Sequence, residues 1–395
     1  MLKVTPGGLE FDQIPWNVLL NKISTPARLY FGKKVLFNCK KFLSTLHKII
    51  PDNKVYFSLK TNYTESIVKL ISSTSLGAEV VSSREFRIAK ESGFADCEIL
   101  LDGIYQNPRY IDIIKMHEQC TPILSWLDSV DDLGTWIKEL GEKRNIGLRF
   151  SYPTKKHRLG IKGDYPNDMG SLVNRLEHFA SNLGIKMLAC HAGSQLMNSS
   201  IFTKNCEYLL HVYDQLEKKG LIESKIELNL GGGFPEPEIA TEKWLKERFI
   251  AIKNIIQENH QVKEFRISFE PGRYIVSDAG VLISKIKQVF DDREAHRWVL
   301  LDAGMDVITR FANNHLRIFS IEHATKPHGN PCSFQGRIPS EKDVFGKGVH
   351  FASDVIKGEH VVLLNCGAYG HTFSRRFSYP PPERYMINGD TIKTI

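Results

Sequence analysis

The sequence predicts an α/β fold in which a (β/α)8 TIM barrel is followed by a mainly β domain. Between about residues 27 and 285, short apolar runs alternate with longer amphipathic stretches, as in repeated strand–helix units. This alternation extends over roughly 250 residues, the usual length of such a barrel. After about residue 285, strand-like runs continue without regular helices between them. The chain of 395 residues is long enough for both domains.

We expect residues 1–26 to be an N-terminal segment that joins the β domain, residues 27–280 to form the barrel, and residues 281–395 to form the β domain. The predicted strands of the barrel region are 28–31, 55–57, 79–81, 99–101, 121–124, 147–150, 187–190, 226–230 and 266–269. Two of the predicted helices are 64–73 and 202–219, and the predicted strands of the β domain include 281–284, 298–301 and 361–364.

The composition excludes several classes of protein. With 42% hydrophobic and 25% charged residues the chain is an ordinary globular protein. Its net charge of +7 comes from scattered basic residues, so we expect a small-molecule ligand and no nucleic acid. We also expect no signal peptide and no membrane span. The seven cysteines show no CxxC spacing, which favours free thiols in a reducing cytoplasm and predicts no metal site.

Lys60 is the most informative residue. It follows residues 55–59, a run of apolar or small side chains that favours a buried strand. An ammonium group there would be desolvated, which costs several kcal/mol or lowers the pKa of the amine. A lysine with a lowered pKa attacks carbonyl groups and forms Schiff bases. The alternative is a strand-end lysine that extends into water, and the rest of the chain favours the nucleophile.

Three consecutive glycines, Gly231, Gly232 and Gly233, follow the predicted strand 226–230. Without side chains, the backbone can approach a ligand closely and turn its N–H groups toward an anion such as phosphate. The segment is neither a Walker A sequence nor a GxGxxG motif. By itself it is interpreted equally well as a plain strand-to-helix turn.

Glu270 and Arg273 follow the predicted strand 266–269. A glutamate at this position can pair with a protonated ring nitrogen, and the arginine can hold a carboxylate or a phosphate. An exposed ion pair in a solvated turn is the alternative interpretation.

His191, Ser194 and Tyr369 also lie at or just beyond predicted strand ends. The ring of His191 can stack on an aromatic ligand, and Ser194 offers a hydroxyl donor for phosphate. Tyr369 stands between glycines in a tight turn that can present its phenol. A structural histidine and a core tyrosine are the alternatives.

Together these segments resemble the fold-type III decarboxylases that depend on pyridoxal 5'-phosphate (PLP), the group that includes diaminopimelate and ornithine decarboxylases. The resemblance runs from about residue 26 to about residue 385, with the segments in the same order. The matching segments are 56–62, 77–82, 157–161, 190–195, 229–235, 269–273, 301–305, 367–370 and 382–383.

The resemblance implies an alanine-racemase-like barrel with PLP bound at its strand ends. Lys60 would form the Schiff base, Glu270 would keep the pyridine nitrogen protonated, and His191 would stack on the ring. The phosphate would be surrounded by Ser194, Gly231, Gly232, Gly233, Arg273 and Tyr369. Arg310 matches an arginine that holds a substrate carboxylate. Members of the family are usually homodimers with shared active sites.

The segment 336–343 departs from the family pattern. Pro339 stands where the family has a cysteine that protonates the substrate carbon, and Cys332 lies seven residues earlier as a possible substitute. Ser340 stands in place of a glutamate and Asn314 in place of a tyrosine, both of which contact the distal end of diaminopimelate. We therefore expect a substrate other than diaminopimelate, such as another amino acid or an amine precursor.

Three hypotheses follow. The first is a cytoplasmic PLP-dependent amino acid decarboxylase, serving for example polyamine or siderophore biosynthesis, with Lys60, His191 or Cys332 as the proton donor. The second is other PLP chemistry at the α-carbon, either racemisation, epimerisation or decarboxylation coupled to transamination. The third is a non-catalytic homologue that binds a partner, against which Lys60 and the complete set of cofactor residues argue.

Overall fold

The computed structural model describes residues 2–103, 109–153, 159–162, 167–222, 225–259, 265–307, 317–374 and 377–395. The chain divides into two compact units. The barrel unit is Asn38–Tyr274, and the β unit combines Met1–Phe37 with Ile275–Ile395. Two helices cross the boundaries between the units, α2 (Gly32–Ile49) and α10 (Arg273–Val276).

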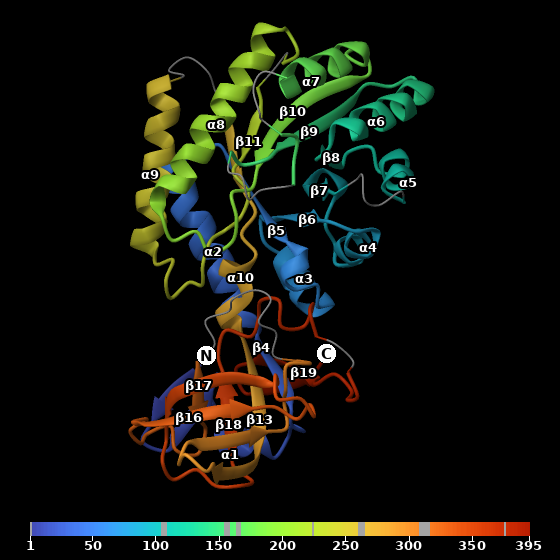
Figure 1. Cartoon of the computed structure of the whole chain (residues 1–395). Coiled ribbons are helices and arrows are strands. Elements are labelled where there is room, and N and C mark those ends of the chain that lie inside the picture. Colours follow the sequence, from blue (N-terminus) through green and yellow to red (C-terminus); the bar gives the residue numbers. More distant parts are fainter. Residues whose placement is uncertain are drawn as a thin grey trace. The chain divides into compact units, whose positions relative to one another are not determined.

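Within the described residues, eight parallel strands close a barrel in chain order, and the last strand pairs with the first (Figure 1). They are β5 (Asn53–Ser58), β6 (Gly77–Val80), β7 (Ile99–Asp102), β8 (Thr121–Leu124), β9 (Arg144–Phe150), β10 (Leu183–Cys190), β11 (Glu227–Asn229) and β12 (Arg266–Phe269). The predicted fold class is confirmed, and the eight predicted runs from 55–57 to 266–269 fall on these strands. β6 and β7 are buried along their whole length, as expected where a parallel sheet is covered on both faces.

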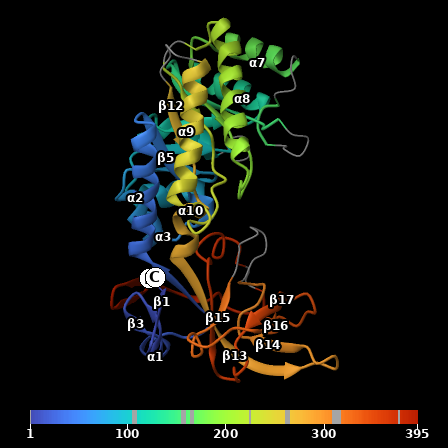
Figure 2. The same cartoon turned by 90° about the vertical axis from the view of Figure 1, so that its left-hand side faces the viewer.

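Helices cover the outside of the barrel. Besides α2, they are α3 (Glu65–Ser72), α4 (Ser83–Glu91), α5 (Arg109–Met116), α6 (Leu127–Leu140), α7 (Asn167–His178), α8 (Ser199–Lys218) and α9 (Glu242–Asn259). Figure 2 shows α2 and α9 running along the same side of the barrel. The predicted helices 64–73 and 202–219 correspond to α3 and α8. Local signals fix several ends, since Ser82 caps α4 by accepting the Glu85 N–H, and Gly141 ends α6 in the left-handed conformation.

The β unit is built on one large sheet and one small one. In the described residues the large sheet contains β4 (Ala27–Phe31), β13 (Gly280–Asp291), β14 (Arg297–Leu301), β15 (Ile318–Ser320), β16 (Asn330–Gln335), β17 (Val344–Phe351), β18 (His360–Leu363), β19 (Glu383–Asn388) and β20 (Thr391–Thr394). The small sheet contains β1 (Leu2–Thr5), β2 (Gly8–Phe11) and β3 (Ile14–Pro15), which leads into the short helix α1 (Trp16–Leu20). Single 3-10 turns are Leu59–Thr61, Asp96–Glu98 and Ser277–Ala279.

The predicted barrel boundaries, 27 and 280, need correction. β4, which was expected to open the barrel, lies in the large sheet of the β unit, where it pairs antiparallel with β13 and parallel with β19. Its five residues are all buried, and an apolar run of this kind carries no information about which sheet it joins. The barrel unit therefore begins with the second half of α2 and ends at Tyr274.

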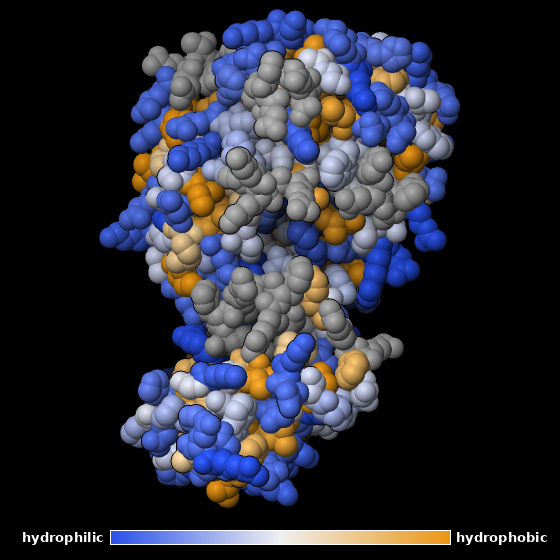
Figure 3. Space-filling view, viewed as in Figure 1, coloured by the Kyte–Doolittle hydropathy of each residue, from blue (hydrophilic) through white to orange (hydrophobic). Residues whose placement is uncertain are grey.

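None of the helices described here is long and apolar enough to cross a membrane. On the face of the barrel unit visible in Figure 3, hydrophilic residues predominate and hydrophobic ones are scattered. The seven cysteines are free thiols, and among the described residues no group of three or more His, Cys, Asp or Glu side chains has the arrangement of a metal site.

Candidate active site

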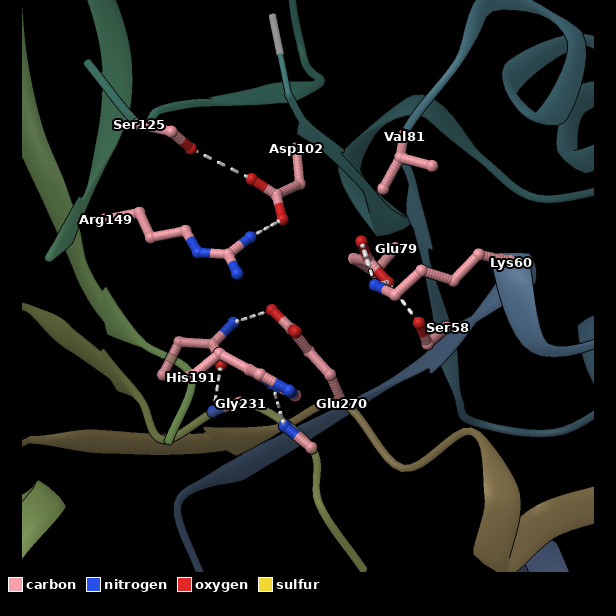
Figure 4. Close-up of polar contacts among 12 residues, drawn as sticks. Ser58, Lys60, Glu79, Val81, Asp102, Ser125, Arg149, His191, Gly231 and Glu270 are labelled. Carbon is pink, nitrogen blue, oxygen red and sulfur yellow. Dashed lines mark hydrogen bonds and ion pairs between the residues drawn. The ribbon is translucent and has the colours of Figure 1, made fainter. Parts of the chain in front are cut away.

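Polar side chains gather at the carboxyl ends of the barrel strands, the edge where functional residues of such barrels lie (Figure 4). They come from seven of the strands or the residues directly after them: Lys60, Glu79, Asp102, Arg149, His191, Asn229 and Glu270. A cavity in the barrel unit is lined by Asp102, Ile123, Arg149, Ala189, Cys190, His191, Asn229, Gly231 and Glu270. The structure therefore brings the predicted residues His191, Gly231 and Glu270 to one place.

Lys60 lies in the 3-10 turn directly after β5 and points toward Glu79. Its Nζ lies 2.9 Å from both carboxylate oxygens of Glu79, which is fully buried, and the hydroxyl of Ser58 also donates to Glu79. The Lys60 side chain keeps 39% of its exposure, so its ammonium group is ion-paired and partly hydrated, in contrast to the desolvated lysine expected from the apolar run. The environment thus supplies Lys60 with a proton acceptor at hydrogen-bond distance.

Glu270 follows β12 and is buried next to other acids. Asn229 donates from Nδ2 to Oε1 of Glu270 at 2.8 Å, which fixes the orientation of the carboxyl group. Burial, followed by the nearby Glu79 carboxylate, raises the pKa of Glu270 to about 8. Burial likewise raises the pKa of Glu85, in the first turn of α4, to about 7. Such raised values in a cavity are typical of functional carboxyl groups.

The three glycines form a cradle beside His191. The N–H of Gly232 donates to Nδ1 of His191 at 3.0 Å, so the proton of a neutral ring sits on Nε2. Gly231 and Gly233 have positive φ angles of 68° and 92°. A Cβ atom on Gly232 would lie 2.7 Å from the carbonyl oxygen of Glu270, and one on Gly231 would lie 2.9 Å from Nδ1 of His191. Only glycine fits this close approach, as the sequence predicts.

The predicted phosphate ligands lie in two units. Ser194 is exposed in the turn after His191, and this turn packs on the glycines because the Leu196 N–H donates to the Gly233 carbonyl at 2.8 Å. Arg273 is buried at the start of α10, with its Nη1 3.5 Å from Oε1 of the buried Glu236. Tyr369 lies in the β unit at a φ of 61°, so its contact with phosphate stays a prediction.

Arg149, Asp102 and Ser125 form a second polar group at the same strand ends. The Nη1 of Arg149 forms an ion pair with Asp102, and the hydroxyl of Ser125 donates to the other oxygen of Asp102 at 3.3 Å. The Nε of Arg149 is buried without a hydrogen-bond partner among the described residues. Arg149 thus places a cation in the lining of the cavity, next to Asp102.

Four further predicted residues belong to the C-terminal part of the chain, and the structure describes two of them, Cys332 and Ser340. Cys332 is 1% exposed in the apolar core around β16, where burial raises the pKa of its thiol, and this placement gives no support to a role in proton transfer. Ser340 is exposed in a turn and its hydroxyl accepts the Lys342 N–H. Arg310 and Asn314 lie outside the described residues.

The departing segment 336–343 forms a loop that is closed by hydrogen bonds. The buried carboxylate of Asp343 accepts the N–H groups of Met305 and Ile338, both at 2.7 Å, and so closes the loop. Pro339 therefore stands at the exposed apex of a well-formed loop.

Sequence reasoning missed Glu79, Asp102, Arg149 and Asn229. Each is a charged or amide residue at, or next to, the carboxyl end of a barrel strand. That position was the available signal, because a buried charge at the carboxyl end of a barrel strand has no structural reason to be there.

The fold and the site define a PLP enzyme of the barrel type. PLP fits the residues present: a lysine that would bind the aldehyde, a buried carboxyl group that would meet the ring nitrogen, and a glycine cradle that side chains would fill. Residues 37–277 match the family of the pyridoxal-dependent decarboxylase pyridoxal binding domain, and residues 210–367 match the C-terminal sheet domain. The chain belongs to the pyridoxal-dependent decarboxylases.

Several relatives cover nearly the whole chain. It is 25% identical over 417 residues to the diaminopimelate decarboxylase of Aquifex aeolicus, covering 100% of this chain and 94% of that protein. It is 26% identical over 398 residues to an L-glutamyl acyl-carrier-protein decarboxylase of Niallia circulans, covering 93% and 89%. The structure of Methanocaldococcus jannaschii diaminopimelate decarboxylase with L-lysine has the same fold, with a TM-score of 0.87, 21% identity, and coverage of 100% and 94%.

The protein is thus a PLP-dependent carboxy-lyase, and pyridoxal 5'-phosphate is its cofactor. The predicted family, fold class, enzyme class and cofactor are confirmed.

Proposed function

We propose that this enzyme removes the α-carboxylate of a diamino acid, with Lys60 as the group that binds the cofactor covalently. The observation that carries the proposal is the paired contact of Lys60 Nζ with both oxygens of the buried Glu79, at the strand ends that also hold Glu270 and His191. A lysine held beside an acceptor at the mouth of a barrel is placed for attack on a carbonyl group.

Each proposed cofactor residue would contact a different part of PLP. Lys60 would hold the aldehyde carbon, Glu270 the ring nitrogen and His191 the face of the ring, whereas the phosphate would lie near the glycine cradle, Ser194, Arg273 and Tyr369. When bound, the cofactor supplies an electron sink for the electron pair that remains after the carboxylate leaves.

Glu79 is proposed as the proton acceptor of Lys60. An amine attacks a carbonyl group only after it loses its proton, and Glu79 offers two oxygens at 2.9 Å for that proton. Ser58 donates to the same carboxylate and so helps to orient it. Glu79 can later return the proton to Lys60.

A proton must also reach the substrate carbon after carbon dioxide leaves. Lys60 and His191 are the candidates that lie at the barrel mouth, and the hydrogen bond from Gly232 to Nδ1 places the proton of a neutral His191 ring on Nε2. Cys332, also predicted as a donor, packs in the apolar core of the β unit.

The carboxyl groups of the site support a substrate with a second amine. At the strand ends and the adjoining turn of α4, they are those of Glu79, Glu85, Asp102 and Glu270. Carboxyl oxygens accept hydrogen bonds from an amine, including those of Glu85 and Glu270, whose pKa values are raised by burial. The names of several relatives, diaminopimelate decarboxylase above all, point the same way. The predicted homodimer with shared active sites and the cytoplasmic location stay predictions.

The test compares substrates that differ by one amine. Release of carbon dioxide is measured with L-lysine, L-ornithine and meso-diaminopimelate, and with L-norleucine, which matches lysine but lacks the terminal amine. We expect at least one diamino acid to exceed norleucine by about 10²-fold or more in kcat/KM. Equal rates for lysine and norleucine, with none higher among the diamino acids, would contradict the proposed substrate class. Exchange of the α-proton without carbon dioxide would instead favour racemase-type chemistry.

A further inference from the structure

Arg149 is a buried cation without a role in the cofactor set described above. It is the next-to-last residue of β9, and its side chain is 16% exposed. Its partner Asp102, at the end of β7, is 4% exposed and is itself held by Ser125 from the loop after β8. Three consecutive strands of the barrel therefore fix the position of one guanidinium group.

The guanidinium group lies between Asp102 and Glu270 (Figure 4). Arg149, Asp102 and Glu270 line the same cavity. The Nε of Arg149 has no hydrogen-bond partner among the described residues, so the ion pair with Asp102 leaves donor capacity unused.

We propose that Arg149 is a positioning residue for Glu270, held by Asp102 so that its positive charge favours the carboxylate form and thereby keeps the proton on the ring nitrogen of the bound cofactor. The inference rests on the proposed role of Glu270. A protonated ring nitrogen is what makes the cofactor an effective electron sink.

The surroundings of Glu270 explain why a permanent cation is needed. Burial, Glu79 and Asp102 raise the pKa of Glu270, whereas Lys60 and Arg149 lower it. His191 lines the same cavity, and Tyr56 lies within electrostatic reach. Lys60 has to give up its proton to act as a nucleophile, but a guanidinium group keeps its charge throughout. Arg149 is therefore the cation near Glu270 that stays constant through the reaction.

The first measurement uses Arg149→Met, which removes the charge, and Arg149→Lys, which restores it. We expect Arg149→Met to lower kcat by about 10- to 100-fold while KM changes little, and to shift the acid limb of the pH profile to higher pH. Arg149→Lys should recover most of kcat. Borohydride fixation of the cofactor to Lys60 should persist in both variants. The control is Arg175→Met, which removes an arginine of α7 that pairs with Asp128 and Asp131 of α6. It should leave kcat, KM and the pH profile unchanged.

The second measurement tests whether Arg149 acts through Glu270. In a Glu270→Gln background, Arg149→Met should cause no further loss of kcat, because the group that it positions is gone. The same loss in both backgrounds would overturn the inference about Arg149. If Glu270→Gln alone leaves kcat and the spectrum of the bound cofactor unchanged, the proposed role of Glu270 fails first. Should Arg149→Met not fold, Asp102→Asn releases the guanidinium group and should show the same dependence on Glu270.

Discussion

The two units use buried charge in opposite ways. In the β unit, both oxygens of Asp343 accept backbone N–H groups, from Met305 and Ile338, and the carboxylate serves to close a loop. In the barrel unit, Arg149 is partly buried, forms an ion pair with Asp102 and lines a cavity beside Glu270. Burial alone therefore does not separate structural from functional charges. The distinguishing property is a position in the lining of a cavity.

The strongest test of this comparison is Lys60→Ala. Loss of the amine removes the covalent bond to the cofactor, so activity should fall by about 10³-fold or more and borohydride should no longer fix the cofactor. Lys246→Ala, which removes a lysine paired with Glu242 on the surface of α9, should leave both properties intact. Activity that survives in Lys60→Ala would assign the carbonyl chemistry to another residue.

Asp343→Ala should affect stability, because it leaves two buried backbone N–H groups without an acceptor. We expect the free energy of unfolding to fall by about 3 kcal/mol, measured by urea denaturation. The control Asp354→Ala removes an exposed carboxylate paired with Lys326 and should leave the free energy of unfolding nearly unchanged. If Asp343→Ala proved as harmless as the control, the loop would not depend on this carboxylate.

Glu270→Gln tests the buried carboxyl group of the barrel unit through the pH dependence of stability. The pKa of Glu270 is raised to about 8 in the folded protein, so the folded state holds a proton that the unfolded state releases above its ordinary pKa. This carboxyl group therefore makes the cofactor-free protein lose stability as pH rises from about 4.5 to about 8. Glu270→Gln should remove that slope and gain about 1 to 2 kcal/mol at pH 9 in urea denaturation.

The matched control is Glu118→Gln. Arg144 lowers the pKa of this exposed carboxyl group, so its contribution to stability is present above the ordinary pKa and is lost as pH falls. Glu118→Gln should therefore give no gain at high pH. An equal gain in both variants would mean that the slope arises from net charge and not from the buried site.

Much of the fold was predictable because an apolar run between amphipathic helices indicates a barrel strand. All eight strands from β5 to β12 have such a run. β4 was assigned to the wrong unit because an apolar run indicates that a strand is buried but not which strands it pairs with. Its partners, β13 and β19, come far later in the chain.

The site was predictable where a residue type carries its own chemistry. Lys60, His191, the glycines and Glu270 were identified in this way. Glu79 and Arg149 were missed because their proposed roles depend on residues from other strands. Glu79 lies 2.9 Å from Lys60. Arg149 lies between Asp102 and Glu270. Such relations appear only when the barrel closes.

The placement of β4 has a consequence for biosynthesis. This strand leaves the ribosome early, but its sheet partners β13 and β19 follow only after the whole segment Asn38–Tyr274 has been made. At the usual rate of translation this takes on the order of 10 to 50 s. During that interval, β4 presents two unpaired hydrogen-bonding edges and an apolar surface, so the nascent chain has a waiting strand that chaperones or a neighbouring chain can bind.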